Sequence, residues 1–207
     1  MKGLILKDFL MMKSYVKTLV ALFLIYAVMG FYNKNASFIS FVVIMISILM
    51  VMSTFSYDNY SKWDLFALSM PIRRKTMVTS KYLYALILCG GCTLISIAVS
   101  IGTSLITGQG EFEEILAVNY GVAAAAILVI AILIPAIYKF GVEKGRFILV
   151  AVYLIPVLLA FILPQNFIPI PTEQQVITAL YVSPIFLLVI FVLSYWLSCR
   201  IYLKKEF

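Results

Sequence analysis

The sequence predicts an all-α integral membrane protein with six transmembrane helices, an amphipathic helix before them, and a cytosolic helix between the second and third spans. Of its 207 residues, 64% are hydrophobic and only 12% are charged, whereas a soluble domain is about half apolar and a quarter charged. A core of this size cannot bury that excess. The apolar residues fall in six long runs, and the basic residues gather on one side of those runs. We therefore expect residues 1–207 to form a single transmembrane domain.

Residues 2–17 are predicted to form an amphipathic interfacial helix. At 100° per residue, most apolar side chains of this segment fall on one side and its lysines on the other. A basic helix of this kind lies in the membrane interface rather than crossing the bilayer. Asp8 falls on the apolar side, which leaves two explanations open: either the helix ends are imprecise, or Asp8 pairs with a basic residue of a cytosolic loop.

Six apolar runs follow, each close to the ~20 residues that span about 30 Å of hydrocarbon. No Asp, Glu, Lys or Arg falls clearly inside a run. Ion-coupled carriers usually keep such residues in the membrane, so this pattern weighs against a secondary transporter. Pro135 and Pro156 fall inside the fourth and fifth runs and are expected to kink them. The predicted spans are residues 18–32, 38–57, 82–107, 117–138, 147–163 and 179–199.

The charges of the loops predict the orientation. All but one of the 16 lysines and arginines lie on the same side of the six runs, the exception being Lys34. The opposite side carries glutamates instead. Because cytoplasmic loops carry an excess of lysine and arginine, both termini and the segment between spans two and three are expected to be cytoplasmic.

Residues 58–81 form the only sizeable polar segment between the apolar runs. Asp58 is a good N-cap, and Pro71 marks the end of the helix that follows it. The simplest interpretation is an ordinary loop whose basic cluster at residues 73–75 sets the topology and binds anionic lipid. A second interpretation is a docking element for a soluble partner.

The apolar residues of this segment favour docking. Trp63, Phe66 and Met70 share one face by their i, i+3, i+7 spacing, while Leu65 and Leu68 lie on the other side with Asp64. A helix lying on a bilayer needs only one apolar face. Apolar residues on two faces suit a helix held between the membrane domain and a second protein.

No pattern in the sequence indicates a catalytic or metal site. The chain has no histidine, the commonest metal ligand and general base, and no nucleotide-binding P-loop. Cys89 and Cys92 have CxxC spacing but lie inside an apolar run, where packing explains them better than metal or redox chemistry. Because the chain lacks a nucleotide site, we expect any energy for work to come from a partner.

Three stretches carry a resemblance to a known family. They are MKGLILKDF at the start, TFSYDNYSKWDLFALSMPIRRKTMVTSKYL around the polar segment, and YKFGVEKGR at residues 138–146. In this order they resemble the permease subunits of type-2 ATP-binding-cassette (ABC) exporters, in the small bacterial branch with six spans. The likeness runs from end to end of the chain. Two residues depart from the usual pattern: Asn59 stands where the family usually has an acid, and Arg73 stands where it often has a serine.

The resemblance implies that residues 58–81 contain a coupling helix seated in a cleft of a separate ABC ATPase subunit. It further implies two ATPases, a second permease that is identical or homologous, and a bacterial plasma membrane. ATP and Mg would be used by the ATPase, with no cofactor bound by this chain and no nucleic acid involved. The family members that it resembles most in character export amphipathic peptide toxins or antimicrobial peptides, or protect the cell against them.

The same resemblance assigns expected roles to individual residues. Asp58 would cap the coupling helix, with Trp63, Phe66 and Met70 as its apolar anchors and Asp64 as a polar contact. A second group would brace the cytosolic ends of the spans. The expected ATPase contacts are Asp58, Lys62, Trp63, Asp64, Phe66, Met70, Arg73 and Arg74, and the expected bracing residues are Asp8, Glu143, Lys144 and Arg146.

Other classes of function compete with an ATP-driven permease. One is a non-transporting immunity or sensor subunit that uses the polar segment only to recruit a partner. Another is a stand-alone carrier or channel. An intramembrane enzyme is disfavoured because the runs hold neither histidine nor acidic residues.

Overall fold

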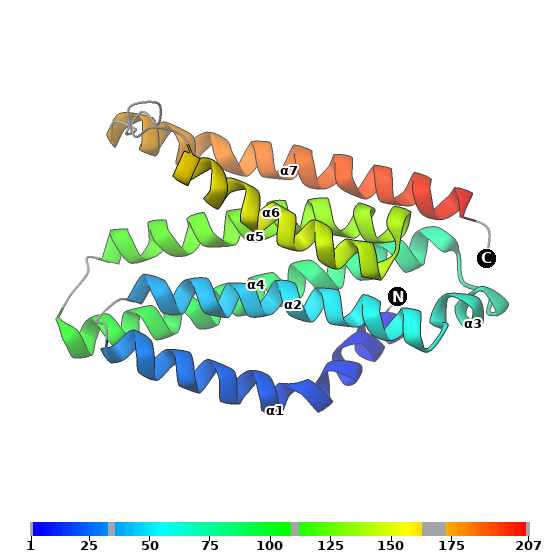
Figure 1. Ribbon diagram of the computed structural model, residues 1–207, viewed down its shortest axis with the longest axis horizontal. Coiled ribbons are helices and arrows are strands. Elements are labelled where there is room, and N and C mark those ends of the chain that lie inside the picture. Colours follow the sequence, from blue (N-terminus) through cyan, green and yellow to red (C-terminus); the bar gives the residue numbers. More distant parts are fainter. Residues whose placement is uncertain (1, 33–35, 109–111, 163–172, 206–207) are drawn as a thin grey trace.

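The computed structural model describes residues 2–205 apart from 33–35, 109–111 and 163–172. Within these residues all regular structure is helical and no strand is present (Figure 1), which confirms the all-α class. The described helices are α1 Lys2–Tyr32, α2 Ala36–Tyr60, α3 Trp63–Ser69, α4 Arg74–Thr107, α5 Phe112–Phe140, α6 Val142–Ile162 and α7 Glu173–Lys204.

Four of these helices are long and apolar enough to cross a membrane, which supports the membrane assignment. They contain the segments Ser40–Tyr60, Arg74–Ile106, Phe112–Phe140 and Val182–Lys204. The predicted span 18–32 lies within α1, and the predicted span 147–163 overlaps α6. Several side chains of both segments, and residue 163, are outside the part of the chain that the structure describes. The count of six spans therefore stays a prediction.

Several helix ends differ from the predicted ones because hydropathy marks the membrane rather than the ends of a helix. α4 begins at Arg74 instead of residue 82, since the mostly polar residues 74–81 extend the helix beyond the start of the apolar run. The predicted loop at 139–146 is instead a tight helix–helix turn. α5 ends at Phe140, Gly141 adopts a φ of 85°, and α6 begins at the next residue. A left-handed glycine after the last helical residue is the common way to stop a helix.

The other glycine of this turn permits a close helix contact. A Cβ at Gly145 would lie 2.7 Å from Cγ1 of Ile137. Such a distance is too short for carbon atoms, so only glycine lets the start of α6 approach the end of α5. The two glycines of YKFGVEKGR thus form the α5–α6 hairpin.

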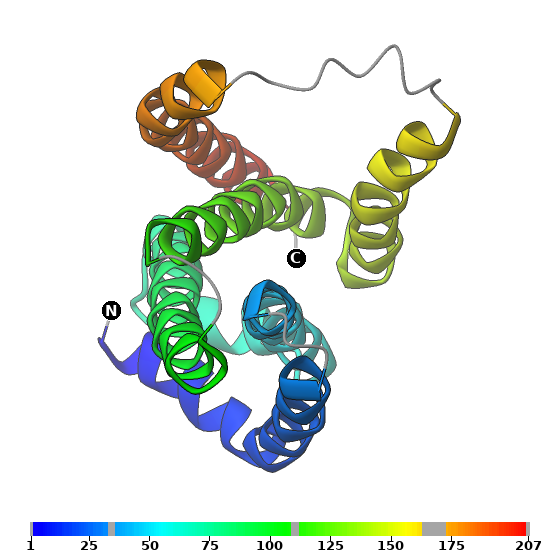
Figure 2. The same cartoon turned by 90° about the vertical axis from the view of Figure 1, so that its left-hand side faces the viewer.

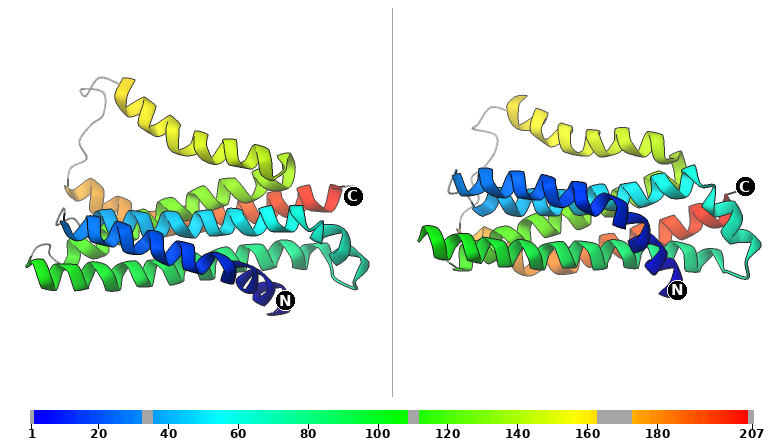
Figure 3. Two further views of the ribbon diagram at one scale, coloured as in Figure 1. Left: turned by 60° about the horizontal axis from the view of Figure 1, so that its bottom comes forward. Right: turned by 90° about the horizontal axis from the view of Figure 1, so that it is seen from below.

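The first helix is continuous over the predicted interfacial segment and the predicted first span. Figure 3 shows that its first turns point in a different direction from the rest. In these turns the side carrying Asp8 and Met12 is buried against the bundle, whereas Leu6 and Leu10 are exposed beside Lys13. The apolar side therefore packs largely on protein, and the interfacial position of the segment stays a prediction.

The core lies among α2, α4 and α5. Its largest fully buried side chains include Ile44, Tyr84, Ile130 and Ile134. α7 and α6 both pack on α5, and the end-on view of Figure 2 shows them standing apart from each other.

Uncharged polar contacts also join the spans. Tyr82 of α4 contacts the hydroxyls of Ser194 and Ser198 of α7, at 2.7 and 2.8 Å. Ser96 donates to Asn119 at 2.5 Å. Hydrogen bonds of this kind link helices in an apolar solvent.

Candidate functional site

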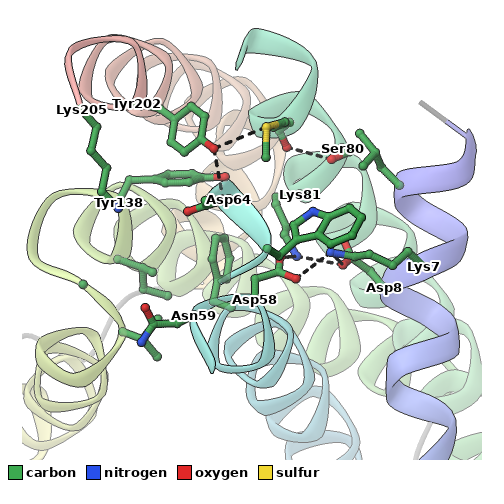
Figure 4. Close-up of a pocket in the computed structure, with 17 residues that line it drawn as sticks. Lys7, Asp8, Asp58, Asn59, Asp64, Ser80, Lys81, Tyr138, Tyr202 and Lys205 are labelled. Carbon is green, nitrogen blue, oxygen red and sulfur yellow. Dashed lines mark hydrogen bonds and ion pairs between the residues drawn. The ribbon is translucent and has the colours of Figure 1, made fainter. Parts of the chain in front are cut away.

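Charged residues of α1, α2, α3 and α4 converge at one end of the bundle. Figure 1 shows the N-terminus, the C-terminus and α3 at this end. The first turns of α1, the ends of α2, α5 and α7, and the start of α4 surround a small cavity, and α3 closes it (Figure 4).

Four charged side chains from three helices form the centre of this site, which we call the charge cluster: Lys7 and Asp8 of α1, Asp58 of α2 and Lys81 of α4. The Lys7 ammonium lies 2.6 Å from Asp58 Oδ1 and 3.2 Å from Asp8 Oδ1. The Lys81 ammonium lies 2.9 Å from Asp8 Oδ1 and 2.5 Å from Asp58 Oδ2. Cations and anions therefore alternate around a closed ring with no formal net charge.

The charge cluster is largely withdrawn from water. The Asp8 side chain is 1% exposed, and those of Asp58 and Lys81 are also buried. Removing one member of a buried ion pair costs about 3–5 kcal/mol, because it leaves an uncompensated charge in a low-dielectric site. The cluster therefore fixes the relative positions of α1, α2 and α4.

Aromatic rings border the two ammonium groups. Lys7 Nζ lies 4.3 Å from the centre of the Trp63 ring of α3, and Lys81 Nζ lies 5.2 Å from that of Phe55 of α2. Both distances are within the range of cation–π attraction. Trp63 thereby connects α3 to the charge cluster.

A second contact connects α3 to the end of α7. The Tyr202 hydroxyl donates a hydrogen bond to Oδ1 of Asp64 at 3.2 Å. Burial raises the pKa of the Asp64 carboxyl, while nearby Lys205 acts in the opposite direction. α3 is thus held through Trp63 on one side and Asp64 on the other.

The cavity enclosed by these groups is too small for a transported molecule. Its volume is about 60 Å³, and Asp8, Asp58, Asp64, Lys81 and Tyr138 are among its lining residues. This is room for a few water molecules. The site is suited to joining helices rather than to binding cargo.

The side of α3 that faces away from the bundle is apolar and exposed. Leu65, Phe66 and Met70, at the C-cap, form this outer face, with exposed fractions of 51%, 54% and 36%. Ala67, between them in sequence, is fully buried. α3 therefore presents a contact surface outward while its other side is tied to the bundle.

Two of the sequence-based predictions for this segment are wrong. Asp58 does not cap α3: it lies in the last turns of α2, since its carboxylate pairs with Lys7 and Lys81, and the N-cap of α3 is Lys62. The predicted faces also differ. Trp63 was expected on the same face as Phe66, but Trp63 lies inward against Lys7 while Phe66 lies outward. Asp64 was expected on the same side as Leu65, but Asp64 lies inward, where it accepts from Tyr202, while Leu65 lies outward.

The basic residues of the segment play different structural parts. Lys62 has a left-handed backbone with a φ of 50°. Arg73 is exposed at the N-cap of α4. Arg74 donates to the carbonyls of Leu203 and Lys205 at 3.0 and 3.1 Å, which ties the start of α4 to the end of α7.

Of the predicted bracing residues, Asp8 joins the charge cluster and the other three lie apart from it. Glu143, Lys144 and Arg146 are exposed in the first turns of α6. Arg146 donates to the Ser56 hydroxyl at 3.2 Å. Among the described residues, the ion pairs include none between Glu143 and Arg146.

Sequence reasoning missed several residues of the site. Of the two explanations for Asp8, the ion pair is the one found, and its partner Lys81 belongs to residues 58–81. A carboxylate on an apolar helix face was the signal that a cation was needed. No sequence signal marked Lys7, Tyr138 or Tyr202 as residues of this site.

Comparison with known proteins identifies the family. A search of curated proteins and a search of solved structures gave no match. Residues 3–203 match the family model described as "ABC-2 family transporter protein". Permeases of this family are membrane components that work with an ABC ATPase. With nearly the whole chain matched, the protein belongs to the ABC-2 transporter family as a membrane permease.

Proposed function

We propose that this permease exports amphipathic peptides, and that a separate ABC ATPase drives it through α3. The observation that carries the proposal is the two-sided environment of α3. Its outer face, Leu65, Phe66 and Met70, is exposed and apolar. Its inner side contacts Lys7 through Trp63 and Tyr202 through Asp64. A displacement imposed on the outer face therefore reaches several spans at once.

The charge cluster makes this connection stiff. α3 bears on Lys7, and Lys7 is joined to Asp58 and, through the ring, to Lys81. Since breaking the ring is costly, α1, α2 and α4 should move together as a rigid body when α3 is displaced. ATP binding can shift the permease only if the ATPase contacts α3 differently in the two states.

The cargo is inferred from the resemblance and is compatible with the polar groups between the spans. The described contacts there are made by uncharged groups such as Ser96, Asn119 and Tyr82. Amphipathic toxins or antimicrobial peptides suit such a membrane domain better than small ions do. In the proposed assembly two ATPases serve two permeases in a bacterial plasma membrane, both termini are cytoplasmic, and ATP and Mg bind the ATPase.

The proposal is tested by co-purification of the ATPase with the tagged permease in mild detergent. Phe66→Ser removes an exposed anchor without opening a buried cavity, so the permease should fold but lose the ATPase. Phe140→Ser is the matched control, since Phe140 is 49% exposed at the end of α5, next to the cavity-lining Gly141. Equal ATPase recovery with both variants would exclude the outer face of α3 as the docking surface.

Reconstituted ATPase activity distinguishes the competing functions. An exporter predicts that amphipathic peptides stimulate ATP hydrolysis by the complex. An ATPase that binds without such stimulation would favour an immunity or sensor subunit. Transport in vesicles that lack any ATPase would favour a stand-alone carrier.

A further inference from the structure

A groove lies between the start of α1 and the segment that leads into α4, and it meets the outer face of α3 at Met70. It has a volume of about 470 Å³, and its walls include Leu4 and Lys7 of α1, Met70, Arg73 and Thr76. Leu65 and Phe66 do not line it. An ATPase bound to the outer face of α3 would leave the part of the groove along Leu4, Arg73 and Thr76 open to another ligand.

The groove combines apolar walls with a positive charge. None of its lining residues is acidic. Lys7 is already neutralised by the charge cluster, but Arg73 is exposed and belongs to none of the ion pairs found within the described ranges. The first turn of α4 contains no acidic residue, so the positive end of the helix dipole adds to the charge of Arg73.

The position of the groove indicates which amphiphilic anion it receives. One wall is the start of α1, whose outward side exposes Leu6 and Leu10 together with Lys13. Exposed leucines and lysines on one helix are typical of the boundary between headgroups and acyl chains. The half-buried Trp63 in the groove is also characteristic of that depth.

We propose that this groove binds an anionic phospholipid, with its phosphate at Arg73 and Thr76 and its apolar part along Leu4 and Ile72. The bound lipid connects α1 to the start of α4 beside the charge cluster. This inference rests on the cytoplasmic, interfacial position proposed for this end of the bundle. It does not require α3 to contact an ATPase.

The test is native mass spectrometry of the purified full-length permease titrated with phosphatidylglycerol or phosphatidylcholine of the same acyl chains. We expect the native chain to bind the anionic lipid in preference. Arg73→Gln should weaken phosphatidylglycerol binding about fivefold, the usual contribution of one basic residue near anionic lipid. Lys144→Gln removes an exposed basic residue outside the groove and should leave binding unchanged.

A second variant distinguishes loss of the lipid site from misfolding of the protein. Thr76→Glu places an acid in the groove at the start of α4, where an acidic residue is favourable to the helix. It should abolish the preference for phosphatidylglycerol while the thermal stability in detergent is kept. Equal binding of the two lipids by the native chain, or a preference that survives Thr76→Glu, would overturn the proposal. Displacement of the lipid by inorganic phosphate would also overturn it, because the site would then hold an anion only.

Discussion

Replacing Asp8 by asparagine perturbs the charge cluster with almost no change in shape. Asp8 is 1% exposed and forms ion pairs with both lysines of the ring, at 2.9 and 3.2 Å. Asparagine fills the same space but leaves Lys7 and Lys81 opposed by Asp58 alone. The cluster then carries a net positive charge in a buried site, which is the situation that makes a broken ion pair costly.

The expected loss of stability follows from this burial. An uncompensated charge of this kind costs about 3–5 kcal/mol. For a protein of about 200 residues this corresponds to a fall in melting temperature on the order of 10 °C. Adding Lys81→Met restores neutrality by leaving the Lys7–Asp58 pair at 2.6 Å. The double variant should therefore lose less than the sum of the two single variants, by about 0.5–3 kcal/mol.

The assay is thermal unfolding of the purified permease in one detergent, with the two single variants, the double variant and a surface control. Glu143→Gln is that control, because Glu143 is exposed and takes part in no ion pair of the described chain. Its effect should stay within about 0.5 kcal/mol. A melting temperature of Asp8→Asn equal to that of the native chain, or strictly additive losses in the double variant, would refute the buried ring.

Three further predictions concern the turns and α3. Gly141→Ala should lower the free energy of unfolding by about 1–2 kcal/mol in thermal unfolding, because the φ of Gly141 is 85°. Gly102→Ala is the control, since Gly102 lies in α4 with open space around it and the change should not destabilise the protein. Equal effects of the two changes would contradict the strained turn. Gly145→Ala should cost about 1–3 kcal/mol through overlap with Ile137, and the cost should shrink in an Ile137→Ala background. Burial raises the pKa of Asp64 above its ordinary 3.8, so the folded state holds that proton more tightly and stability falls as pH rises from 3.8 through the raised pKa. Asp64→Asn should abolish this fall in a pH series of melting temperatures, and an identical pH profile would count against the burial of Asp64.

The fold class and the location of the site could be predicted from the sequence because both follow from local composition. Long apolar runs require helices in a membrane, and a polar segment between two of them has to lie outside it. Pro71 also ended the preceding helix as expected, since α3 stops at Ser69. The predicted start of the third span came too late, because most of residues 74–81 are polar and fall outside the apolar run, yet they continue the same helix.

The contacts of the site depend on tertiary structure and were predicted only in part. Asp8 on an apolar face showed that a buried cation was needed, but Lys81 is 73 residues away in sequence. Asp58 resembles an N-cap locally, yet two lysines from other helices compete for its carboxylate. The orientation of α3 is likewise set by contacts with Tyr202 of α7 and Lys7 of α1, so spacing alone wrongly grouped the inward Trp63 with the outward Phe66.

Site-specific photocrosslinking tests the central claim most directly. A photoreactive phenylalanine analogue would replace Phe66 on the outer face of α3 in one sample and Phe140, at the end of α5 next to the cavity-lining Gly141, in the other. If α3 couples the ATPase to the spans, the probe at position 66 crosslinks to the ATPase, with a yield that changes when ATP is bound, and the probe at position 140 does not. If neither probe reaches the ATPase, or both do so equally whether or not ATP is present, α3 is not the coupling element.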